Sequence, residues 1–146
     1  MLGLLAIVVT AGIVWTVFSQ IDDWSRDLSQ NTAELTEQAQ DPRLRPVVVS
    51  MTIDSTVAKI ETFAKQNSAW QLVDQTLARD SASLKLTRTS TLFRFVDDVQ
   101  VEITAKTDAE GLPQCVVHAS SASRVGKGDL GQNPRNLVAL TEAIKD

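Results

Sequence analysis

The stretch VQVEITAK at residues 99–106 alternates apolar and polar side chains over its whole length. Successive side chains of a β-strand point to opposite faces of a sheet, so this pattern predicts a strand with one buried and one solvent-exposed face. Residues 83–89 alternate in a similar way, and residues 70–78 and 115–123 are predicted as further strands. Because these strands follow one another at short spacing, with Gly111 in one of the turns, they favour an antiparallel sheet.

Two amphipathic helices are predicted around these strands. The first runs over residues 54–67, with Asp54 as its N-cap, and follows a strand at residues 47–53. The second begins at Asn133, which caps free amides, with Pro134 at the first helical position. The order strand, helix, several strands, helix predicts an α+β fold, a two-layer sandwich in which two helices cover an antiparallel sheet.

The first 21 residues carry no charged side chain and are almost entirely apolar. About 20 helical residues span the hydrocarbon layer of a bilayer, so residues 1–21 are predicted to form a transmembrane helix. A cleaved signal peptide is the alternative, but no basic residue precedes the apolar run. Arg26 favours a domain on the cytoplasmic-type side, although one residue leaves the side open. The residues assigned to the membrane are Leu4, Leu5, Ile7, Ile13, Trp15 and Phe18.

Residues 22–45 are predicted to form a juxtamembrane helical arm and linker. A thin apolar stripe that includes Leu28 and Leu35 recurs at helical spacing, and Pro42 and Pro46 then interrupt the helix. The arm is interpreted as a continuation of the membrane helix, and a docking helix for a partner protein is the alternative. A boundary near residue 45 leaves residues 46–146 as the α+β domain.

Charge and residue composition exclude several classes of function. The net charge of −4 divides into −3 over residues 22–45 and −1 over residues 46–146, without the clustered Lys and Arg residues that bind nucleic acid. Cys115 is the single cysteine and His118 the single histidine, so one chain cannot build an ordinary zinc site. No metal, cofactor or nucleic acid is therefore expected.

Two adjacent acids, Asp97 and Asp98, begin the alternating strand. Neighbouring strand residues point to opposite faces, so these two carboxylates cannot act as an acid/base pair. His118 has no ordered acid beside it in the pattern, which makes nucleophilic catalysis with a nearby serine improbable. The sequence therefore predicts that the protein is not an enzyme.

The segment at residues 121–135 leads from a strand into a helix and contains three glycines. Its glycines and basic residues suit a rigid strand-to-helix turn, with an anion-binding loop as the alternative. The phosphate-loop pattern is absent, and a dinucleotide fingerprint matches only as letters. We expect Arg124 or Arg135 to bond to Asp129, or to Asp97 or Asp98, and a partly buried carboxylate to lose its partner if Arg124 is removed.

Together with an amphipathic C-terminal helix, the segments FRFVDDV at residues 93–99 and HASSASRVGKGDLGQNPR at residues 118–135 resemble the bacterial and plastid family known as domain of unknown function 1499. The resemblance covers residues 46–146. It implies a small α+β domain, often exported or membrane-tethered, with no established reaction, in a plasma or thylakoid membrane. The most specific pattern is carried by Ser123, Arg124, Val125, Gly126, Asp129, Gly131, Asn133 and Arg135.

These observations lead to two hypotheses of function. The first is a non-enzymatic accessory or assembly subunit, held in the lipid bilayer and bound to other subunits of a larger membrane complex, with a photosynthetic complex implied by the resemblance. The alternative is a tethered module that binds a lipid, pigment or anion, with Arg94, Arg124 and Arg135 as polar groups.

Overall fold

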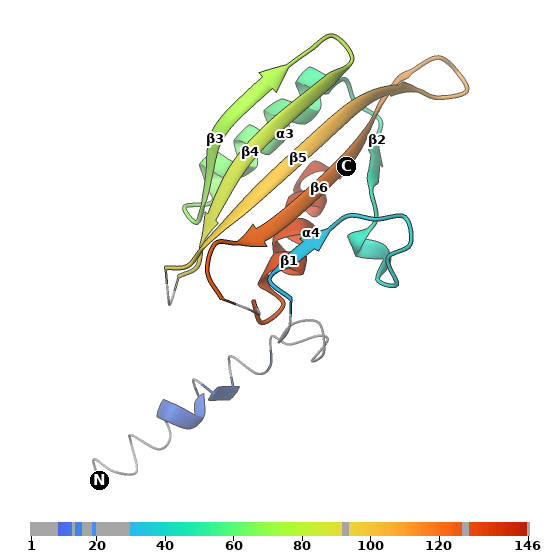
Figure 1. Ribbon diagram of the computed structural model, residues 1–146. Coiled ribbons are helices and arrows are strands. Elements are labelled where there is room, and N and C mark those ends of the chain that lie inside the picture. The colour runs from blue at the N-terminus through green and yellow to red at the C-terminus, as the bar shows by residue number, and fades with distance from the viewer. Residues whose placement is uncertain are drawn as a thin grey trace.

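The protein folds around an antiparallel sheet with its helices on one face, as the computed structural model shows (Figure 1). The structure describes residues 9–12, 14, 15, 19, 30–91, 94–126 and 129–145. Its elements from residue 30 onward are β1 (Thr32–Glu34), a 3-10 turn η1 (Pro42–Leu44), β2 (Val47–Val49), α3 (Ile53–Gln66), β3 (Trp70–Leu77), β4 (Ser81–Thr89), β5 (Val96–Thr107), β6 (Pro113–Ser123) and α4 (Gln132–Ile144).

Six strands of the described chain form this sheet, in the order β1-β6-β5-β4-β3, and β2 also pairs with β6. Thr32–Glu34 pair with one end of β6 and Val47–Val49 with the other, so two short strands share one edge. The long central strands β4, β5 and β6 are joined by short connections, as the sequence predicts for antiparallel neighbours. The α+β class and the antiparallel sheet are thus confirmed.

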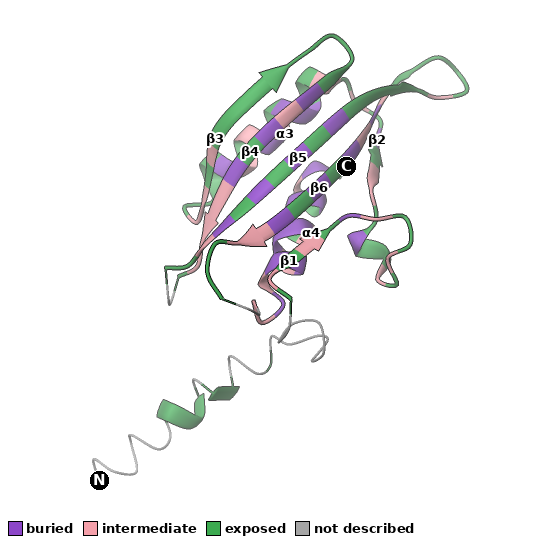
Figure 2. Cartoon of the chain, in the orientation of Figure 1, coloured by how far each residue is buried: buried purple, intermediate pink, exposed green. Residues whose placement is uncertain are grey.

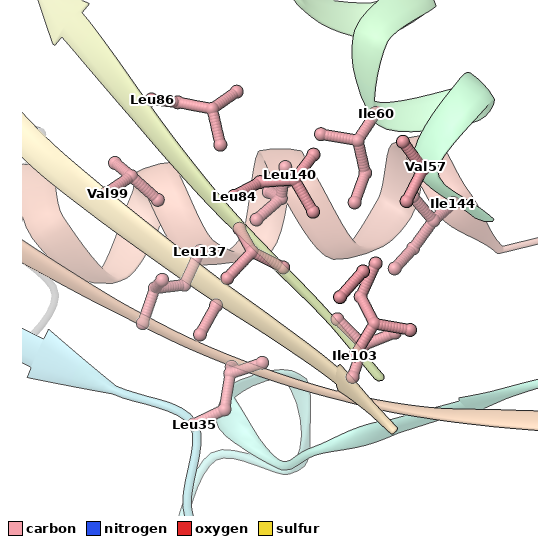
Figure 3. Close-up of a cluster of buried hydrophobic side chains, with 14 of the residues drawn as sticks. Leu35, Val57, Ile60, Leu84, Leu86, Val99, Ile103, Leu137, Leu140 and Ile144 are labelled. Carbon is pink, nitrogen blue, oxygen red and sulfur yellow. The ribbon is translucent and has the colours of Figure 1, made fainter. Parts of the chain in front are cut away.

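The core lies between the sheet and the two helices. Alternate residues of β4, β5 and β6 are buried, which appears as purple bands along these strands (Figure 2). Side chains of α3 and α4 point into the same layer as the strand residues (Figure 3). Full burial of one such aliphatic side chain contributes about 1.5 to 3 kcal/mol. Ile60, Leu84, Val101, Val117, Leu137, Leu140 and Ile144 are fully buried.

The helical arm predicted for residues 22–45 is wrong for its described part, residues 30–45. Residues 32–34 form β1 on the edge of the sheet, and Leu35 is buried in the core. Pro42 opens the 3-10 turn η1, whose Leu44 is also buried. Backbone pairing with β6 and burial of the two leucines prevail over the weak helical stripe, so the domain begins near residue 30 rather than 46.

The predicted membrane span falls mostly on residues that the structure does not describe. Trp15 belongs to a described helical stretch at residues 9–12, 14 and 15 and is exposed. Within the described part of the chain, no helix has both the length and the apolar character needed to cross a membrane. Outside the described residues lie Leu4, Leu5, Ile7, Ile13 and Phe18.

The N-caps of both helices lie two residues before the predicted ones. Thr52 rather than Asp54 is the N-cap of α3, because its hydroxyl accepts a hydrogen bond from Ser55 N at 3.3 Å. Gly131 rather than Asn133 is the N-cap of α4, with a φ of 73°. The strand predicted at residues 47–53 is shorter, ending at Val49. A hydrophobic period locates an element well but does not show which side chain takes the cap.

Candidate functional site

The motif residues gather at one end of the sheet, where β5 begins, β6 ends and α4 begins (Figure 1). The strand register aligns Arg88 of β4, Asp97 of β5 and Ser123 of β6 in one row across the sheet. Asp97 and its alternating neighbours face the helices, so this row meets the first turns of α4.

Five side chains of β5, β6 and α4 form a closed ring of hydrogen bonds, here called the polar ring. Asn136 Nδ2 donates to Asp97 Oδ2 at 2.9 Å and to Ser121 Oγ at 3.1 Å. Ser121 Oγ donates to Asn133 Oδ1 at 2.5 Å, and Asn133 Nδ2 donates to Ser123 Oγ at 3.0 Å. Ser123 Oγ then donates to Asp97 Oδ1 at 2.6 Å. Both branches of donors therefore end on one carboxylate.

Asp97 is 3% exposed, so its two bonds from the polar ring replace hydration that burial removes. Arg88 lies beside it, with its guanidinium nitrogen Nη1 3.9 Å from Asp97 Oδ2 and a side chain only 17% exposed. That nitrogen is buried without a hydrogen-bond partner. Burial lowers the pKa of the Arg88 guanidinium, and the Asp97 charge opposes this shift. Arg88 therefore supplies charge rather than a direct hydrogen bond.

Asp98 lies on the opposite face from Asp97, as the alternation predicts. Arg124 donates two hydrogen bonds to the Asp98 carboxylate, from Nε to Oδ2 at 2.9 Å and from Nη2 to Oδ1 at 2.6 Å. The hydrogen bond from Arg124 lowers the pKa of Asp98. Both side chains are 53% exposed, so the expectation of a partly buried carboxylate is wrong for this pair. Exposure to water weakens the contribution of such a pair to stability.

Asp129 caps the start of α4 instead of pairing with an arginine. Its carboxylate accepts from Gly131 N at 2.9 Å and from Asn133 N at 2.5 Å. These are free amides of a helix N-terminus, where a negative charge is favourable. Gly126 and Gly131 have φ values of 98° and 73°, the left-handed conformation that glycine adopts without strain. These two glycines therefore have the backbone conformation that a tight strand-to-helix turn requires.

Residues of the strand-to-helix segment also bond to Gln30 and Asn31, at the N-terminal start of the described domain. Asn31 O accepts from Asn133 Nδ2 at 2.7 Å, and Asn31 Nδ2 donates to Gly126 O at 2.9 Å. Asp129 N donates to Gln30 O at 3.2 Å. We call Gln30 and Asn31, held in this way, the junction. The polar ring thus fixes both α4 and the start of the domain.

The three arginines proposed for an anion are not brought together on one ligand site. Arg124 is engaged by Asp98, and Arg135 Nη2 donates to Leu130 O at 2.9 Å. Arg94 is exposed in the β4–β5 connection, with a positive φ of 56° and its amide bonded to Ser90 O. The three arginines therefore make contacts in three different parts of the domain.

Sequence reasoning missed Ser121, Asn136 and Arg88 as members of this site. Two signals were present: serines at alternate positions of a strand share one face, and asparagines three apart share one face of a helix. Asn133 was assigned to capping, although its side chain is fully buried within the ring. Only the strand register shows that these two faces meet.

The two serines of the polar ring lie apart from the single histidine of the chain. Both ring hydroxyls donate to acceptors within the ring, while His118 is exposed and pairs in register with Glu102 on β5. Ser121 and His118 lie on opposite faces of β6, so no base reaches the ring serines from there. Among the described residues, no group of three or more His, Cys, Asp or Glu side chains is placed to hold a metal ion.

Comparison with protein families identifies the chain. A family model described as Protein of unknown function (DUF1499) matches residues 23–144. The chain belongs to this family. The match includes the whole polar ring and begins before the junction, in agreement with a domain that starts near residue 30. No curated protein matches the chain.

Proposed function

We propose that this family member is a non-enzymatic accessory or assembly subunit, anchored by residues 1–21 and bound laterally to a larger membrane complex. The uncharged apolar stretch of residues 1–21 supports the anchor, since its length suits the hydrocarbon layer. A plasma or thylakoid membrane fits the family resemblance. Its role is to present the α+β domain at a fixed place beside its partners.

The observation that carries this proposal is the junction. Asn31 accepts a hydrogen bond from Asn133 and donates one to Gly126. The chain is therefore bonded to the rest of the domain at the point where the N-terminal segment joins it. The donors of the polar ring bond to neighbouring protein groups, which suits a structural scaffold more than an active site. A domain held rigidly at its tether can offer the same surface to a partner at all times.

The test is purification of the tagged full-length chain from native membranes in mild detergent, with crosslinking and mass spectrometry. We expect discrete co-purifying subunits and crosslinks from the domain to them. The anchor is disrupted by Ile13→Lys, because a charge in the middle of a membrane helix costs about 2.5 to 3.5 kcal/mol, and Thr104→Lys is its matched control. The Ile13→Lys variant should lose both membrane association and partners, whereas Thr104→Lys on an exposed strand position should keep both. A chain that always runs as a free monomer contradicts the proposal.

A second candidate is a tethered module for a lipid, pigment or anion. The observation that favours it is Arg88 Nη1, which is buried without a hydrogen-bond partner. An acidic group of a small molecule would satisfy this donor. Native mass spectrometry of the full chain and of Arg88→Met separates the cases. A small molecule retained only by the unaltered chain supports binding, and no retained molecule in either contradicts it.

A further inference from the structure

We propose that the end of the domain carrying Phe95 and Val125 rests on the surface of the lipid bilayer. This contact surface consists of Arg94, Phe95, Arg124 and Val125 and is called the basal surface below. The inference rests on the proposed anchor and adds the orientation of the domain and a second site of lipid contact. The partner is a bilayer surface that contains anionic lipids.

The length of the tether brings the basal surface to the membrane. The predicted span ends at Ile21, and Gln30 is fixed to Asp129 beside the basal surface. Eight residues, 22–29, lie between these positions, and the nine steps from one Cα to the next span at most about 32 Å in a fully extended chain. The opposite end of the sheet lies a further ~40 Å away, because β5 has 12 residues at ~3.4 Å each. The tether therefore favours contact at the basal end.

The residues of the basal surface lie on neighbouring strand ends. Arg124 N donates to Val96 O at 3.0 Å, which places Phe95 and Val125 as the next residues outward. Phe95 is 50% exposed and Val125 is 63% exposed. The amide of Phe95 is held by Ser90 Oγ at 2.9 Å, so the backbone of this residue is fixed. Apolar side chains held at such a position can enter the headgroup region of a bilayer.

The charges at the two ends of the sheet differ in the sense that an anionic membrane requires. Arg94 is the one charged residue in the connection between β4 and β5. The turns at the other end, between β3 and β4 and between β5 and β6, hold Asp80, Asp108 and Glu110 against Arg79. Basic residues next to an anchor are attracted to anionic lipids, and acidic ones are repelled.

Fluorescence of a polarity-sensitive dye tests the contact in the full-length chain. Phe95→Cys, Val125→Cys and Leu112→Cys are labelled with a maleimide dye and reconstituted into vesicles of phosphatidylcholine and phosphatidylglycerol in equal parts. Leu112 is a matched control, because it is apolar and 56% exposed but lies in the far turn. Native Cys115 is fully buried, and burial raises the pKa of its thiol, so it resists labelling.

We expect the dye at residues 95 and 125 to emit at shorter wavelength and to be quenched several-fold more by spin-labelled lipid than the dye at residue 112. Equal, weak quenching at all three positions of a chain that floats with vesicles overturns the basal contact and leaves the anchor intact. Strong quenching at residue 112 refutes the orientation. A chain that fails to float with vesicles refutes the anchor itself.

The charge of Arg94 gives a second measurement. Arg94→Glu should reduce the quenching of the dye at residue 125 in vesicles with phosphatidylglycerol, and less in vesicles of phosphatidylcholine alone. Lys106→Glu, at an exposed position near the opposite end of β5, changes the charge by the same two units; it is the charge-matched control and should leave the signal unchanged. An equal effect in both kinds of vesicle contradicts the role of anionic lipid.

Discussion

Replacing Asp97 with asparagine tests the polar ring most directly. The carboxylate accepts from Ser123 Oγ and from Asn136 Nδ2, whereas an amide offers one acceptor oxygen and adds two donors. Either orientation of Asn leaves at least one buried donor without a partner, at a cost of about 1 to 3 kcal/mol. Arg88 also loses its counter-charge, which adds about 1 kcal/mol after discounting for the 3.9 Å separation and partial exposure.

We therefore expect Asp97→Asn to destabilise the protein by about 3 kcal/mol, a large share of the ~5 to 15 kcal/mol of a typical domain. For a domain of roughly 100 residues, this corresponds to a Tm lower by roughly 12 to 24 °C. Asp98→Asn is the matched control: it is the same substitution one residue along the same strand, on the exposed face. It should cost only a small fraction of that loss.

The assay is equilibrium unfolding of the full-length chain in mild detergent, followed by near-ultraviolet circular dichroism. Trp70 reports on the core, because its ring packs edge-on against Phe63 with centroids 5.0 Å apart. The double variant Arg88→Met with Asp97→Asn should recover part of the loss, since it removes the charge left unpaired. Equal stability of Asp97→Asn and Asp98→Asn would refute the role assigned to the ring.

Three further predictions follow from the same contacts. Asp129→Ala removes the acceptor for Gly131 N and Asn133 N and should cost about 1 to 2 kcal/mol in urea unfolding, and Asp129→Asn should cost less. Arg88→Met alone should change the stability by less than about 1 kcal/mol, because removal of a buried donor that has no partner offsets the loss of the counter-charge of Asp97, which keeps both of its hydrogen bonds; a larger loss would show that the counter-charge outweighs the unpaired donor. Acidification should weaken the pair of Asp98 and Arg124: the pKa of Asp98 is lowered in the folded state, so its contribution is complete above about pH 4 and is lost as the pH falls through the folded pKa. The pH dependence of unfolding below pH ~4 should accordingly be shallower in Asp98→Asn than in the unaltered chain.

The corrections to the sequence-based predictions share one physical cause. Asn133 matches a helix cap as well as a buried ring member, and what decides between them is the presence of Ser121 and Ser123 across the interface. Residues 32–34 lie within the arm that a weak apolar stripe predicts to be helical, but β6 offers them an edge to pair with. In both cases the local pattern permits two states, and partners distant in sequence select one.

By itself the sequence determined the elements whose patterns are strong: the alternating strand at residues 99–106, the two amphipathic helices, and opposite faces for Asp97 and Asp98. These follow from periods of 2.0 and 3.6 residues, which are local properties of the chain. Only the tertiary structure decided that Asp97 is buried within a ring while Asp98 pairs at the surface with Arg124. Hydrogen-bond partners 26 to 39 residues apart depend on strand register and helix placement, which no local period contains.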